Sequence, residues 1–197
     1  KSLYNMNSFG VESVVSTNKV LKNTYMLLGM TLLFSAVTAG ISMAMGLPQG
    51  AALILTLVGF GLLFVVNRMA DSSKGLIAIF AFTGVMGASI GPMLNYYLSM
   101  PGGPALVMQA LGGTALVFFG LSAYALTTRK DFSYMGGFLM VGLLVAVVAM
   151  IANIFLAIPA LSLTISAAVV MIMSGLILFD TSRIINGGET NYIMATY

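Results

Sequence analysis

Long apolar runs, separated by short polar stretches, fill most of this 197-residue chain. A helix crosses the ~30 Å hydrocarbon core of a bilayer with about 20 apolar residues. The pattern therefore predicts an all-α, polytopic membrane helix bundle with six transmembrane helices. These helices are expected at residues 25–46, 51–68, 75–99, 105–127, 134–157 and 160–179, the last continuing toward 185.

Charge is confined to alternate connections between these runs. The turns at residues 47–50, 100–104 and 158–159 carry no charged side chain. The cations at the other ends of the predicted spans are Lys19, Lys22, Arg68, Lys74, Arg129, Lys130 and Arg183. Lys and Arg collect on the cytoplasmic side of membrane proteins. We therefore expect both ends of this sequence to lie in the cytoplasm.

Three segments follow from this topology. Residues 1–24 are rich in Ser, Asn and Thr and are expected to form a flexible, polar cytoplasmic tail. Residues 25–185 form the transmembrane domain, and residues 186–197 form a second polar cytoplasmic segment. The six spans use nearly the whole chain, so no room remains for a separate soluble domain.

Composition narrows the functional classes. Charged residues make up 7% of the chain, against about 25% in soluble domains, so the first partner is the lipid bilayer. The net charge of +3 does not indicate nucleic-acid binding, because the basic residues stand singly or in pairs between apolar runs. The chain has no Cys and no His, and so lacks imidazole bases, thiol nucleophiles and the usual zinc ligands. We expect no enzyme, no cofactor and no bound metal.

Most carboxylates lie in the tails and loops. Asp71 lies three residues before Lys74, and Asp131 follows Arg129 and Lys130 directly. We expect each aspartate to be the solvated partner of its neighbouring cations.

Small and amide residues within the spans predict helix packing. Gly87 and Gly91 form a G-x-x-x-G motif, which lets helix backbones approach closely in lipid. Pro92 is expected to kink its helix, because proline lacks the N–H that a helix interior needs. Asn95 and Asn153 are expected to bond neighbouring helices, as buried amides in membranes usually do.

Asp180 follows about twenty apolar residues and is expected at the cytoplasmic edge of the membrane. Two interpretations stay open: an interfacial carboxylate beside Arg183 at i+3, or a proton-sensing gate that faces the bundle interior. A negative charge near a helix C-terminus opposes the helix dipole, so a cation should compensate it.

Arg68 is the cation that we expect to pair with Asp180. The apolar run before it, residues 51–66, is only sixteen residues long, so Arg68 is drawn toward the hydrocarbon. It must then pair with a carboxylate or extend its side chain to lipid phosphates. Arg68 and Asp180 end spans that run in the same direction, and we expect a direct or water-bridged pair.

Several segments resemble the Bax inhibitor-1 family. They are GVMGASIGPML at 84–94, the segment 110–133 that ends in TTRKDFS, Asn153-Ile154-Phe155, and Leu178–Thr181. LKNTYML at 21–27 and GGETNY at 187–192 are similar to bacterial inner-membrane members of the family. The resemblance implies a fold of seven helices, six of them around a central seventh, and we expect this chain to lack the seventh.

The resemblance implies two functions. Some bacterial members bind the membrane AAA protease FtsH, modulate its action and are its slow substrates; the segment from Lys1 to Lys22 would be the handle that the protease grips. Other members are pH-sensitive calcium leak channels. Asp180 matches their helix-six aspartate and Arg68 their helix-two arginine, with Arg183 as a further candidate and calcium as the transported ion. The FtsH function is the primary expectation, the channel is the alternative, and the oligomeric state is left open.

Overall fold

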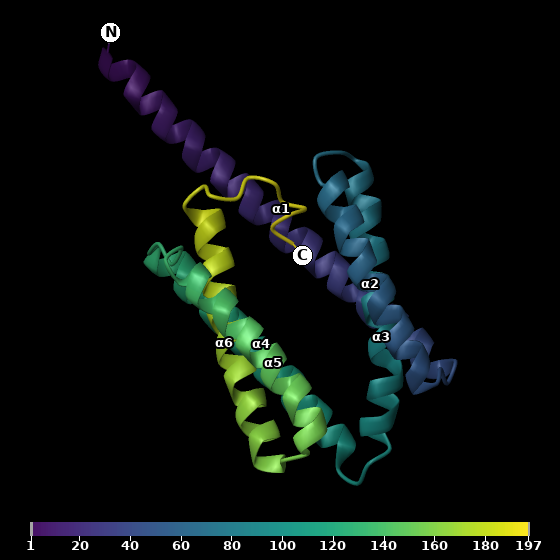
Figure 1. Ribbon diagram of the computed structural model, residues 1–197. Coiled ribbons are helices and arrows are strands. Elements are labelled where there is room, and N and C mark those ends of the chain that lie inside the picture. Colours follow the sequence, from purple (N-terminus) through teal and green to yellow (C-terminus); the bar gives the residue numbers. More distant parts are fainter. Residues whose placement is uncertain (1, 197) are drawn as a thin grey trace. The chain divides into compact units, whose positions relative to one another are not determined.

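The computed structural model describes the backbone of residues 2–196 and the side chains of residues 17–196. This part of the chain is helical, without β-strands, as the sequence predicts (Figure 1). All of its six helices are long and apolar enough to cross a membrane. They are α1 (Ser2–Ala44), α2 (Gln49–Met69), α3 (Lys74–Leu98), α4 (Gly103–Thr128), α5 (Met135–Leu156) and α6 (Pro159–Ile185).

Helix α1 is much longer than the predicted first span. The backbone of the predicted tail is helical, because helix already begins at Ser2. Between Ser2 and Thr24 the sequence has no proline and a single glycine, Gly10, so nothing there interrupts a helix. Figure 1 shows α1 as one long helix that starts at the N-terminal end.

The chain divides into two compact units. The first comprises Lys1–Gly112 with Glu189–Tyr197, and the second comprises Gly113–Gly188, so the boundary falls inside α4. In the first unit, α3 packs against both α1 and α2. In the second, α5 and α6 form an antiparallel hairpin.

Glycine lets α3 approach α1 closely. Gly87 and Gly91 are both buried, and a Cβ added to Gly87 would collide with the Ser35 carbonyl of α1. One turn further along α3, Asn95 donates its Nδ2 hydrogen to the Met43 carbonyl of α1 at 3.0 Å. The small residues thus permit the contact, and the amide adds a hydrogen bond across it.

Pro92 lies inside α3, and α1 compensates for it. Proline cannot donate to the carbonyl four residues earlier, so the Ala88 oxygen loses its helical partner. The Ser42 hydroxyl of α1 donates to this oxygen at 2.7 Å. Gly91 makes the approach possible, because a Cβ there would meet the Ser42 side chain. A hydrogen bond from another helix therefore satisfies a carbonyl that lipid could not.

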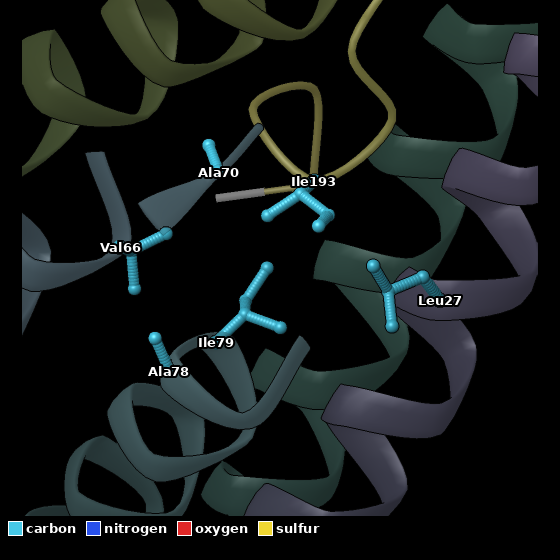
Figure 2. Packing of buried hydrophobic residues seen from close by; sticks show 6 residues of the cluster. All are labelled: Leu27, Val66, Ala70, Ala78, Ile79 and Ile193. Carbon is cyan, nitrogen blue, oxygen red and sulfur yellow. The ribbon is translucent and has the colours of Figure 1, made fainter. Parts of the chain in front are cut away.

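The core of the first unit lies where α2 and α3 meet their connecting turn. Figure 2 shows its buried side chains, which come from Leu27, Val66, Ala70, Ala78, Ile79 and Ile193. Ile193 belongs to the segment after α6 and is only 3% exposed. The predicted polar C-terminal segment therefore contributes an apolar residue to a helix core.

The α5–α6 turn is held by Asn153. Ala157 stands in the left-handed region with φ 50°, and its N–H bonds the Asn153 carbonyl. The Asn153 side-chain oxygen accepts the N–H of Ile158 at 3.2 Å. Asn153 thus shapes the turn between its own helix and the next, whereas its place within the span predicted a bond to a neighbouring helix.

Candidate functional site

The residues that could act chemically lie at the charged ends of the helices. They occur near the α2–α3 turn in the first unit, and near the end of α6 and the α4–α5 loop in the second. In the first unit, Asn191 donates its Nδ2 hydrogens to the Ala70 carbonyl at 3.0 Å and to Asp71 Oδ1 at 2.9 Å. Its Oδ1 accepts the N–H groups of Ile193 and of the next residue. Asn191 therefore clamps the turn after α2 to the C-terminal segment.

This clamp changes the role expected for Asp71. The carboxylate bonds the Asn191 amide, and within the described part of the chain it forms no ion pair with Lys74. Proximity in sequence favoured the cation, but a side chain 120 residues away supplies a directed donor. Asp71 is therefore a structural acceptor.

Arg68 lies in the last turn of α2, two residues before the clamped Ala70. Its side chain is exposed. Arg68 belongs to the first unit and Asp180 to the second, so their pairing stays a prediction. The backbone just after Arg68 is held in place, because Asn191 bonds the Ala70 carbonyl.

In the second unit, Asp180 is exposed near the end of α6. Arg183, one turn later, acts electrostatically on the Asp180 carboxylate. Its guanidinium carbon also lies 5.5 Å from the centroid of the Phe179 ring, in cation–π range. Arg183 is thus a cation near Asp180 on its own helix, and it offsets a negative charge at a helix C-terminus.

Ser182 joins the end of α6 to the loop before α5. Its side chain is fully buried, and its Oγ accepts the N–H of Phe132 at 2.9 Å. In the same loop, Asp131 Oδ1 accepts the N–H of Ser133 at 2.8 Å and also the Ser133 hydroxyl hydrogen. These bonds favour the charged carboxylate, so the Ser133 side chain first, and then its N–H, lower the pKa of Asp131.

The donor set is poor in metal ligands. Among the described residues, no three His, Cys, Asp or Glu side chains lie close enough together to hold a metal ion. Calcium normally takes six to eight oxygen ligands.

Comparison with known proteins defines the family. The family described as "Inhibitor of apoptosis-promoting Bax1" matches residues 17–197. The chain belongs to the Bax inhibitor-1 family. Within this family it is 58% identical to the Escherichia coli K12 protein named "Modulator of FtsH protease YccA", over 93% of this chain and 84% of that protein.

Other Bax inhibitor-1 relatives are similar along nearly the same length. An uncharacterized membrane protein of Vibrio cholerae is 51% identical over 94% of this chain and 84% of its own length. An uncharacterized protein of Pseudomonas aeruginosa is 46% identical over 98% of this chain and 86% of its own. The Vibrio cholerae relative is named as a membrane protein, which agrees with the six apolar helices of this chain.

Sequence reasoning missed the anchoring residues Asn191, Ser182 and Ser42. Asn191 stands in a polar tail, where an amide is ordinary, and its only local signal is the apolar Ile193 that follows two residues later. The role of Ser42 could have been predicted in kind. A proline inside an apolar run leaves one carbonyl without its helical donor, and a serine of a neighbouring helix is a natural replacement.

Proposed function

We propose that this protein binds the FtsH protease in the bacterial inner membrane and restrains its action on other membrane proteins, while being itself degraded slowly. The observation that carries the proposal is the 58% identity to a named FtsH modulator over 93% of this chain. The role is one of binding and not of catalysis, in keeping with a chain that has no His and no Cys.

The handle that we propose for the protease is the segment from Lys1 to Lys22. Lys1 lies outside the described residues, as do the side chains of residues 2–16. The backbone from Ser2 is helical, and Lys19 and Lys22 are exposed. A short polar stretch of helix is marginally stable in water, so a protease that unfolds its substrates can open it at low cost.

The test uses FtsH, this protein and a second membrane substrate reconstituted together in liposomes. We expect the full chain to co-purify with FtsH and to slow degradation of the second substrate. Deletion of residues 1–22 should slow degradation of this protein several-fold while co-purification persists. The control replaces residues 1–22 with the same residues in scrambled order.

Each part of the proposal has its own contrary result. Failure of the full chain to co-purify with FtsH, or to protect the second substrate, would overturn the modulator function. Equal decay of the deleted and full chains would remove the handle and leave the modulator function intact.

The alternative that we propose is a pH-sensitive cation leak through Asp180. It is supported by an exposed carboxylate within a helix long enough to cross the membrane, with Arg183 acting on it. Calcium flux into liposomes, followed across pH, should then be abolished in Asp180→Asn and retained in the matched loop variant Asp71→Asn. Flux equal to that of empty liposomes at every pH would exclude the leak.

A further inference from the structure

The loop between α4 and α5 carries two cations that its own aspartate does not bind. Arg129 and Lys130 are exposed, and neither forms an ion pair with any residue that the structure describes. The neighbouring Asp131 instead accepts the N–H and the hydroxyl of Ser133. The two positive side chains therefore stay available to an anion from outside the chain.

The loop has a defined conformation. Directly after the end of α4, Arg129 stands in the left-handed region at φ 51°, and its N–H bonds the Ala125 carbonyl at 2.9 Å. Phe132 is tied to the buried Ser182 through its N–H, and its ring lies 6.3 Å from the Tyr124 ring. The backbone on both sides of Lys130 is therefore held by hydrogen bonds, at Arg129 and at Phe132.

Exposed aromatic side chains adjoin the cations at the start of α5. Tyr134 is 79% exposed and Phe138 is 77% exposed. Residues four apart on a helix lie on one face, so the two rings form one exposed aromatic strip. Aromatic residues of this kind collect at the level of the lipid headgroups, and both α4 and α5 are long and apolar enough to cross the membrane.

We propose that Arg129 and Lys130, together with Tyr134 and Phe138, bind the headgroup of an anionic phospholipid. A guanidinium can donate two parallel hydrogen bonds to phosphate oxygens, and an ammonium adds a compact charge. The exposed rings continue the site from the cations toward the hydrocarbon, where an acyl chain lies and an acidic peptide does not. This role is separate from FtsH binding.

Native mass spectrometry of the full chain in detergent tests the site, with phosphatidylglycerol as the probe and phosphatidylcholine as the neutral comparison. The variant combines Arg129→Asn with Lys130→Gln, because asparagine tolerates the left-handed backbone. The matched control, Lys19→Gln with Lys22→Gln, removes two exposed cations from α1. A juxtamembrane cation is worth roughly a factor of five in affinity for anionic lipid. The loss of two cations should therefore weaken phosphatidylglycerol binding by the variant roughly 25-fold.

The control should keep its phosphatidylglycerol, and both proteins should unfold at the same temperature as the parent in lipid-free detergent. An equal loss in variant and control would show general charge attraction and overturn the site. Binding of a short polyglutamate peptide as tight as that of phosphatidylglycerol, and lost in the same variant, would overturn the assignment to lipid.

Discussion

A single hydroxyl decides how α3 accommodates its proline. Pro92 leaves the Ala88 carbonyl without its helical donor, and Ser42 supplies one from α1 at 2.7 Å. Ser42 is only 2% exposed, so water cannot replace it. Helix α3 therefore depends on α1 for a hydrogen bond that an ordinary helix makes internally.

Ser42→Ala is expected to destabilise the protein by about 0.5–2 kcal/mol, the scale of interhelical hydrogen bonds in membranes. Pro92→Ala restores the missing N–H, so in that background the same serine change should cost close to zero. The measurement is a double-mutant cycle on the free energy of unfolding. Equal costs in the two backgrounds would show that Ser42 acts through packing and not through the Ala88 carbonyl.

Asp131 offers a second test at this scale. The hydrogen bonds from Ser133 lower the pKa of Asp131, so their stabilising effect is present above the unfolded-state pKa and is lost as pH falls through the lower folded-state pKa. Ser133→Ala should therefore raise the Asp131 pKa toward its ordinary value. Carbon-13 NMR titration of the labelled carboxylate measures it, and an unchanged pKa would contradict the assigned cause.

Whole elements are held at their ends by segments distant in sequence. The turn after α2 is fixed by Asn191, and the loop before α5 is fixed by Ser182. Ile193, beside Asn191, adds an apolar anchor to the core of α1, α2 and α3. The C-terminal segment is therefore a structural part of the first unit and not a loose tail.

Asn191→Ala is expected to free the turn between α2 and α3. The part-buried Ala70 carbonyl loses its donor, at a cost of about 1–3 kcal/mol, whereas the exposed Asp71 carboxylate can bond water instead. Truncation of Ile193 to Ala opens a cavity in the core, at a cost of about 2–5 kcal/mol. Hydrogen–deuterium exchange of residues 70–74 should be faster in both variants. The control is Thr190→Ala, at an exposed neighbouring residue. If residues 70–74 exchange as slowly in Asn191→Ala as in this control, the clamp is refuted.

At the scale of the molecule, the chain consists of two units that share α4 and are joined by the segment after α6. The predicted pair of Arg68 and Asp180 would bridge these units. Arg183 lies three residues after Asp180 on α6 and would compete with Arg68 for the same carboxylate.

A double-mutant cycle with Arg68→Ala and Asp180→Ala is expected to give a coupling energy of about 0.5–1 kcal/mol, the upper range for exposed ion pairs. The same cycle with Arg183→Ala in place of Arg68→Ala measures the local competitor. Thermal unfolding in detergent provides the free energies. A coupling near zero for Arg68 beside a measurable one for Arg183 would assign Asp180 to its own helix alone.

The sequence by itself determined the six helices, because crossing a membrane depends on the length of an apolar run, which is a local property. It also indicated the close contact at Gly87 and Gly91, since small residues at helical spacing have few other uses in lipid. It did not determine the N-terminal extension of α1, where a polar composition suits both a tail and a helix.

Tertiary structure decided which polar groups meet. Asn191 and Ala70 are 121 residues apart, and Ser42 and Ala88 are 46 apart. A hydrogen bond needs its donor and acceptor within about 3 Å, and no periodicity along the chain specifies that distance between remote segments. Local pattern therefore predicted the helices and their charged ends, while packing alone selected Asn191, Ser182 and Ser42 as the side chains that hold those ends and helices together.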